Sequence, residues 1–440
     1  MSSAATSVRT PVAILGAGLT GLSAAIELGR RDVGYRIFEK LARAGGHAVT
    51  VEEQGFRFDR TGHLLHLKND ALRAEVLGWL GPDYLQIQRR SVIWSNGVYT
   101  RYPFQANTFG LPPQVAYECV QGFVAAHFAQ DKPEPTNFEE FCLYHFGEGI
   151  SRHFMIPYNS RLWGVHPREI TSSWCQRFVP LPRLEDVIAG AVGLNDRELG
   201  YNSNFIYPRL GIGELAAGMA RRVPKLELGR SPLRIELATR RLLFDDEQVP
   251  FDVLLSSIPL PQLLALIDDV PEPVRKAAAK LRCSHLHYLD VALARPAGKD
   301  FHWAYVPEAK YPFYRVGCYS HFSGALTPPG KSSLYVELAD RSPPELDELL
   351  PEVARGLIEM GVIDSADEIE FARARCIDYA YVIFDHEYFA ALDVIFPFLE
   401  AARIISSGRY GSWNYSAMED AILFGKAAAE RALEFQRIPA

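Results

Sequence analysis

The sequence predicts a mixed α/β fold, and three observations carry that prediction. An apolar run at 12–15 leads through a glycine-rich turn into a helix-like stretch at 22–28. Apolar residues recur at helical spacing between 113 and 190, and strand-forming residues dominate from about 285 to 340. Together they predict a Rossmann-like nucleotide-binding domain with a helical insertion and an antiparallel β-sheet substrate domain.

The first element is a strand, glycine turn and helix near the N-terminus. Gly16, Gly18 and Gly21 form a GxGxxG pattern, which permits a tight turn, a close approach of backbone to a pyrophosphate, and close packing of helix on strand. The helix N-terminus then offers amide donors to the phosphates. A second strand, 35–38, ends in Glu39, at the spacing expected for a carboxylate that accepts from an adenosine ribose hydroxyl. The unit therefore predicts a bound dinucleotide.

The residues after Glu39 favour FAD over a nicotinamide cofactor. A second glycine pair, Gly45 and Gly46, precedes an expected short strand pair that ends near 55–59, and Gly62 and His63 follow. This pattern is similar to the large flavoprotein group that includes amine oxidases and protoporphyrinogen oxidases. The alternative interpretation is a nucleotide-binding fold that has lost its ligand.

Later segments extend the same architecture. Two strand-forming runs flank Asn96-Gly97 and predict a hairpin over 92–100, and Asn137 is expected to cap the helix that follows it. Further elements are expected over 211–220 and from about 417 to 434 as helices, and over 252–259, 288–293, 333–338 and 404–409 as strands. The predicted FAD-binding domain is discontinuous and comprises 8–80, 205–265 and 400–440. The helical insertion is assigned to 106–190, and the mainly β-sheet substrate domain to 81–105, 191–204 and 266–399.

Composition limits the classes of partner. The chain has 440 residues, 48% of them apolar, and a net charge of −7, so no global field attracts nucleic acid or an anionic membrane. An anionic substrate would need local arginines. The six cysteines lack the spacing of a metal site and are expected to be reduced, mostly buried thiols. The sequence shows no apolar leader and no run of 18 apolar residues, so we expect no stable membrane insertion. A cytoplasmic location is the expected one.

Several clusters then resemble UDP-galactopyranose mutases, the eukaryotic type in particular, in family order from about residue 10 to 430. The matching stretches are 102–107, 157–163 with Trp174 and Arg177, 204–208, 312–315, 384–388 and 408–415. The resemblance implies an FAD-dependent isomerase that interconverts pyranose and furanose forms of a nucleotide sugar without net redox change. Reduced flavin N5 would attack the anomeric carbon and expel the nucleoside diphosphate. Such a mutase needs a reductant, either NADPH or a flavin reductase.

The resemblance also assigns residues to roles. It implies catalytic roles for Gly62, His63, Arg177 and Arg315, of which the arginines suit a diphosphate by donating paired hydrogen bonds. It places Arg409 and Asp420 at the cofactor, although Asp420 is equally able to cap a helix. The implied substrate-binding residues are Tyr102, Phe104, Gln105, Asn159, Trp163, Asn204, Tyr305, Tyr388 and Tyr415. Surface salt bridges for the arginines and core packing for the tyrosines are the alternatives.

The chain departs from the family at a few places, and other functions stay open. His66 stands where fungal members carry an aromatic residue, Phe322 replaces a tyrosine, and Arg60-Thr61 replaces small residues before the loop glycine. An FAD-dependent oxidase or dehydrogenase of the amine oxidase or protoporphyrinogen oxidase kind is the second interpretation, and a non-catalytic flavoprotein is the third. The expected partner is a small nucleotide sugar, with no metal and no nucleic acid; the sequence sets no oligomeric state.

Overall fold

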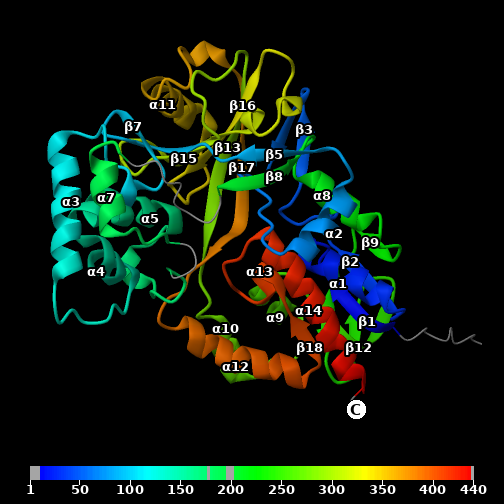
Figure 1. Ribbon diagram of the computed structural model, residues 1–440. Coiled ribbons are helices and arrows are strands. Elements are labelled where there is room, and N and C mark those ends of the chain that lie inside the picture. The colour runs from blue at the N-terminus through cyan, green and yellow to red at the C-terminus, as the bar shows by residue number, and fades with distance from the viewer. Residues whose placement is uncertain (1–9, 176–178, 195–202, 438–440) are drawn as a thin grey trace, which may run out of the picture.

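The computed structural model describes residues 10–175, 179–194 and 203–437 and contains two seven-stranded sheets with a helical unit beside them (Figure 1). The first sheet has the order β10-β11-β12-β1-β2-β9, and β18 pairs with β12. Strands β18, β12, β1, β2 and β9 run parallel, whereas β10, β11 and β12 form an antiparallel meander. Its strands are β1 Thr10–Leu15, β2 Tyr35–Glu39, β9 Leu226–Leu228, β10 Arg234–Glu236, β11 Arg241–Leu243, β12 Gln248–Ser256 and β18 Ile404–Ser406.

The central strands of this sheet are apolar and buried. Residues 12–15 of β1 are almost inaccessible, because α1 (Leu19–Arg30) and α14 (Met418–Arg437) pack together over one face of the sheet. The hydroxyl of Ser23 donates to the backbone oxygen of Ile422 at 2.7 Å and joins the two helices. The C-terminal helix thus packs on the helix that follows the N-terminal glycine turn.

The second sheet has the order β17-β13-β16-β15-β14-β6-β7 and is antiparallel except where β14 meets β6. The predicted hairpin at Asn96-Gly97 is confirmed, and both turn residues have positive φ angles, 55° and 75°. The long strands β13 and β17 extend from this sheet toward the unit that contains the first sheet (Figure 1). The strands are β6 Ser91–Ser95, β7 Val98–Arg101, β13 Cys283–Leu293, β14 Trp303–Tyr305, β15 Phe313–Cys318, β16 Ser332–Leu338 and β17 Ile369–Val382.

A helical unit lies at the β7 side of the second sheet (Figure 1). It contains α3 Pro113–Phe128, α4 Phe138–Ile150, α5 Ile156–Trp163 and α7 Leu184–Ala191. Asn137 caps α4 by accepting from the Glu140 amide at 3.0 Å, which confirms the predicted cap. Helices α3 and α4 approach to backbone contact: a Cβ added at Gly149 would lie 2.1 Å from the backbone oxygen of Glu118. This glycine contact joins the two helices more closely than ordinary side chains allow.

The remaining elements connect these units. Strands β3 (Thr50–Glu53) and β4 (Phe56–Asp59) form a hairpin, and β5 (Tyr84–Gln88) pairs with β8 (Asn204–Pro208). The other helices are α2 Asp70–Leu80, α8 Gly213–Ala220, α9 Leu260–Leu266, α10 Glu272–Ala278, α11 Leu346–Glu359, α12 Tyr388–Ala401 and α13 Gly408–Gly411.

The predicted fold class is confirmed as a mixed α/β fold with a separate, mostly antiparallel sheet. The limits assigned to the three domains stay a prediction. All six cysteines are free thiols, four of them buried, in agreement with the expectation from their spacing. Within the described ranges, no helix is long and apolar enough to cross a membrane.

Candidate functional site

The N-terminal glycine turn leads into a helix whose first amides have no side-chain cap. Helix α1 begins after Gly18 with no side-chain cap and no acidic residue in its first turn, in contrast to α2, which Asn69 caps and Asp70 opens. Its first amides therefore remain available as donors. Gly21 packs so closely that an added Cβ would lie 1.9 Å from the Gly16 backbone oxygen. Any side chain there would open the turn.

Glu39 is fixed at the end of β2 beside this turn. Its carboxylate accepts from the Ala17 amide at 2.9 Å and from the Leu41 amide at 3.0 Å. A carboxylate has about four acceptor positions, so two remain for ribose hydroxyls. This geometry fits the predicted role of Glu39, which stays a prediction.

The second glycine pair lies directly against the first turn. Gly45 forms a parallel bridge to Gly18, and its amide donates to the Ala17 oxygen at 2.8 Å. The Gly45 φ of +115° and a distance of 2.8 Å from an added Cβ to the Ala48 oxygen both require glycine. The two glycine motifs, separate in sequence, thus form one continuous backbone surface.

Asp59 is the buried anchor of the loop that carries Gly62 and His63. Its carboxylate accepts from the Thr50 hydroxyl at 2.6 Å, the Tyr207 hydroxyl at 2.5 Å and the Ile212 amide at 3.2 Å. Burial raises the pKa of Asp59 to about 6, although these three donors oppose the shift. The anchor ties the β3–β4 hairpin to β8 and α8, and thereby fixes where the loop begins.

His63 is a half-buried, neutral imidazole. Its Nδ1 is buried and has no hydrogen-bond partner in the described part of the chain. Burial, and after it the positive charge of Arg409, lowers the pKa of His63 to about 4. Next to it, an added Cβ at Gly62 would lie 2.5 Å from the Tyr335 hydroxyl oxygen. The glycine therefore lets the histidine loop lie flat on the second sheet.

The neutral state of His63 makes stability depend on pH in a predictable direction. The unfolded histidine protonates near its ordinary pKa of 6.5, whereas the folded one does so only near 4, so its stabilisation is present above pH 6.5 and is lost as pH falls. From pH 6.5 to pH 4, wild type should lose about 3 kcal/mol more unfolding free energy than the His63→Asn variant. Denaturant titrations of both proteins at several pH values check this, and parallel stability curves would contradict it.

Arg315 lies on β15 and forms an ion pair with a buried carboxylate. Its guanidinium donates to the carboxylate of Glu337, a residue on β16 that is 0% exposed, and lies 3.4 Å from the Tyr381 hydroxyl. The Arg315 side chain is 19% exposed, and its Nε has no partner among the described residues. One side of the guanidinium is therefore held by protein while donor capacity remains for a ligand.

Arg409 holds the C-terminal segment together. Its guanidinium donates to the backbone oxygens of Ser416 at 2.6 Å and Ala380 at 3.0 Å, and lies over the Tyr415 ring at 4.6 Å. It also lowers the pKa of His63, as described above, so His63 and Arg409 share one electrostatic environment. Asp420 accepts from the Ala417 amide at 2.8 Å, the contact expected of a helix-capping residue.

Aromatic side chains form the wall near Arg315. Tyr305 stacks on Tyr102 with ring centroids 5.2 Å apart and contacts Tyr158 edge to face. The Arg89 guanidinium lies over the Tyr102 ring, 4.8 Å from its centroid. Trp163 contacts Tyr415 at 6.0 Å. The structure thus brings together predicted residues from the segment after β7, from β14 and α5, and from the C-terminal segment.

Other predicted substrate residues already have internal contacts. Phe104 is fully buried and stacks on Phe154 at 4.9 Å. The side chains of Gln105, Asn159 and Tyr388 donate to the backbone oxygens of Pro180, Met155 and Trp413, respectively. Asn204 is exposed at the start of β8, and its side-chain amide donates to the Ser203 hydroxyl oxygen at 3.5 Å. Their substrate roles stay predictions, and Arg177 lies outside the described residues.

Sequence reasoning missed Glu337, the partner of Arg315. A sequence signal for it exists: it is the one charged residue in 332–338, a strand buried at every position. A carboxylate in such a strand needs a cationic partner. The pairing of His47 with Arg60 was also missed; His47 directly follows the second glycine pair, and Arg60 precedes the loop of Gly62 and His63.

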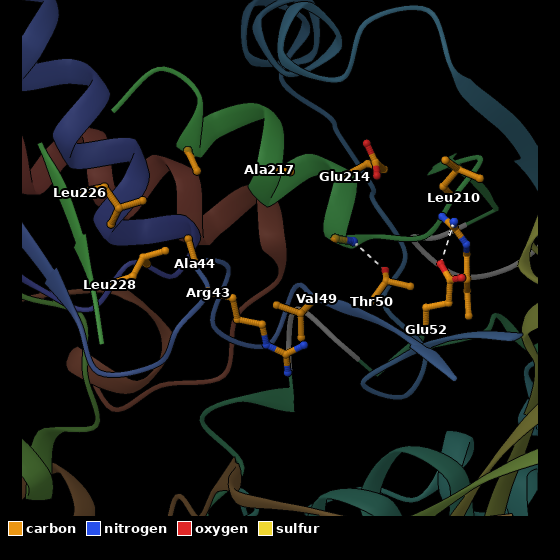
Figure 2. A pocket seen from close by; sticks show the side chains of 13 residues that line it. Arg43, Ala44, Val49, Thr50, Glu52, Leu210, Glu214, Ala217, Leu226 and Leu228 are labelled. Carbon is orange, nitrogen blue, oxygen red and sulfur yellow. Dashed lines mark hydrogen bonds and ion pairs between the residues drawn. The ribbon is translucent and has the colours of Figure 1, made fainter. Parts of the chain in front are cut away.

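A pocket of about 350 Å³ lies on the other side of the glycine-pair loop (Figure 2). It is bordered by the loop at Arg43 and Val49, by β3, by α8 and by Leu226 and Leu228 of β9. Thr50 accepts from the Gly213 amide at 2.9 Å across one edge. None of the predicted site residues lines this pocket. Across the described ranges, no three His, Cys, Asp or Glu side chains are placed to hold a metal ion.

The fold and the glycine-turn geometry define a mixed α/β protein with a Rossmann-like flavoprotein fold. The family model of an NAD(P)-binding Rossmann-like domain matches residues 14–77. Among solved structures, the chain is similar to reduced UDP-galactopyranose mutase, with a TM-score of 0.91 and 26% identity over 97% of this chain and 94% of that one.

The amine oxidase and protoporphyrinogen oxidase architectures are also similar. A structure from Exiguobacterium, named provisionally as a protoporphyrinogen oxidase, has a TM-score of 0.75 and 18% identity over 99% of this chain and all of that one. Cyclohexylamine oxidase from Brevibacterium oxydans has a TM-score of 0.71 and 14% identity over 98% of this chain and all of that one. At these identities the two structures show a shared fold alone.

Proposed function

We propose that the chain binds FAD and, with the cofactor reduced, interconverts the pyranose and furanose forms of a nucleoside-diphosphate sugar of the UDP-galactose type. The observation that carries the proposal is Arg315, a cation held on one side by Glu337 and surrounded by tyrosines. A diphosphate leaving group requires such a donor. The similarity to reduced UDP-galactopyranose mutase over nearly the whole chain supports the same activity.

The residues of the nucleotide-binding domain fit FAD. The amides that follow Gly18 would receive the pyrophosphate, Glu39 would accept from the adenosine ribose, and Gly45 and Gly46 would let the cofactor pass close to backbone. Arg409 and the His63 loop would border the flavin end. When bound and reduced, the flavin supplies the nucleophile of covalent catalysis.

The protein's own task is to position the substrate and to stabilise charge. Arg315 would donate to the diphosphate as it departs, and Glu337 would hold the guanidinium in place. Tyr305 and Tyr415 would add hydroxyl donors, and Arg177 would add a second cation. His63, neutral at working pH, would orient the flavin ring and its loop without repelling the nearby arginines. A cytoplasmic location, NADPH as the reductant and membership of the eukaryotic type remain parts of this proposal.

An oxidase or dehydrogenase is the competing function, and the shared fold with cyclohexylamine oxidase favours it. Such an enzyme would need a largely uncharged substrate cavity. A half-buried Arg315 paired with the buried Glu337 among tyrosines does not fit that requirement as well as it fits a diphosphate. Flavin reduction by an amine, without any sugar nucleotide, would support this competitor.

An anaerobic conversion assay tests the proposal. The purified protein is reduced with dithionite, mixed with UDP-galactofuranose or UDP-galactopyranose, and followed by chromatography. We expect interconversion that requires reduced FAD and consumes no further reductant. The oxidised protein is the matched control and should be inactive. Absence of conversion together with absence of nucleotide binding would overturn the mutase proposal in favour of the oxidase.

A further inference from the structure

His47, the residue directly after the second glycine pair, has a fixed tautomer. Arg60 Nη1 lies 3.1 Å from His47 Nδ1. A guanidinium only donates hydrogen bonds, so Nδ1 must be the acceptor and carries no proton. The proton of the neutral ring is therefore on Nε2.

The ring of His47 stays neutral. Burial, followed by the positive charges of Arg60, His63 and Arg409, lowers the pKa of His47 to about 3. The ring lies edge to face against Tyr410 of α13, with centroids 5.3 Å apart. A neutral ring wedged in this way presents one fixed N–H donor over the whole range of working pH.

The Nε2–H of His47 has no acceptor among the described residues, and the nitrogen is not sealed from solvent by them. Arg60 likewise forms no ion pair with a described carboxylate. Its charge contributes to lowering the pKa of Arg43, after burial of that residue. Positive side chains therefore lie next to the glycine pair, and the Nε2–H of His47 lies among them without an acceptor. We expect an electron-rich group of a ligand to accept this hydrogen bond.

The position of His47 indicates which ligand group this is. On one side Gly45 bridges to Gly18 of the pyrophosphate turn, and on the other Tyr410, His63 and Arg409 border the proposed flavin end. His47 therefore lies between the two ends of the proposed cofactor site.

We propose that Arg60 is a positioning residue that holds His47 in its Nε2-protonated tautomer, so that Nε2–H donates to bound FAD between its pyrophosphate and its flavin ring. This inference rests on the FAD binding of the proposed function but not on the mutase activity. Arg60 acts through His47, so a lysine at position 60, which also only donates hydrogen bonds, should perform the same role. A carboxylate, which only accepts, should reverse the tautomer.

The test is a set of FAD titrations of the apoprotein, followed by flavin fluorescence. Arg60→Glu should weaken FAD binding roughly tenfold or more, the loss expected for one hydrogen bond to a charged or strongly polar group. Arg60→Lys, the matched control, should bind as wild type does. In a His47→Phe background, Arg60→Glu should cause much less further loss, because the histidine through which Arg60 acts is absent.

A spectroscopic measurement keeps the inference independent of variant folding. In ¹⁵N-histidine-labelled wild type, the resonances lost in His47→Phe should show a protonated Nε2 and an unprotonated Nδ1, and FAD should shift the Nε2 signal. A protonated Nδ1, unchanged FAD affinity in Arg60→Glu, or an equal loss in the His47→Phe background would overturn the inference. A wild-type protein that binds FAD but converts no sugar nucleotide would overturn the mutase proposal alone.

Discussion

Replacement of Arg315 with alanine should lower the free energy of unfolding by about 3–5 kcal/mol, because it leaves the carboxylate of Glu337 buried without its charge partner. If Arg315 also binds the diphosphate, the variant should lose about 2–5 kcal/mol of transition-state stabilisation. The kcat/KM of the mutase reaction should then fall by about 30-fold to several thousand-fold. Chemical denaturation and anaerobic kinetics measure the two effects separately.

A double variant separates stability from catalysis at this pair. Arg315→Met combined with Glu337→Leu removes both charges and fills a similar volume, so much of the lost stability should return. Activity should not return, because neither new side chain can donate to a phosphate. Full activity in the double variant would show that Arg315 has only a structural role, and the proposed diphosphate site would then be wrong.

Substitution of Gly21 by alanine should abolish FAD binding and cost about 3 kcal/mol of stability. The new Cβ would lie 1.9 Å from the Gly16 oxygen, and that oxygen belongs to backbone at a φ of +91° that cannot readily move. The first turn of α1 would shift and its amides would no longer converge on one anion. FAD content after purification and thermal unfolding measure the outcome.

Gly29→Ala is the matched control for Gly21→Ala. Gly29 lies in the same helix but is exposed, and its added Cβ would meet nothing closer than 3.7 Å. Alanine there should leave FAD binding intact and raise stability by up to about 1 kcal/mol. Equal loss of FAD in both variants would contradict the assignment of the glycine turn.

Local patterns were predictable from the sequence. The turn at Gly16–Gly21, the Asn96-Gly97 hairpin and the Asn137 cap each depend on residues within one turn or one hairpin, and each was predicted correctly. The cofactor and substrate assignments drew on resemblance to a family as well as on the residues. The fold class followed from the order of such elements.

The partners of buried polar groups were not predictable in the same way. Arg315 and Glu337 face each other because β15 and β16 pair in a register that shifts between Phe313 and Arg315. Such a register is set by the packing of a whole sheet. Likewise, the stacking of the Phe104 ring on Phe154 depends on how the helical unit assembles, so the sequence alone could not predict it.

The glycine contact between α3 and α4 limits how the helical unit can respond to a ligand. An added Cβ at Gly147 would lie 2.0 Å from the Gly122 oxygen, so the two backbones touch and leave no side-chain layer through which the helices could slide. Shear between packed helices requires such a layer. If the enzyme closes around its substrate, the pair α3–α4 should therefore move as a rigid body, with bending confined to its connections to the sheet.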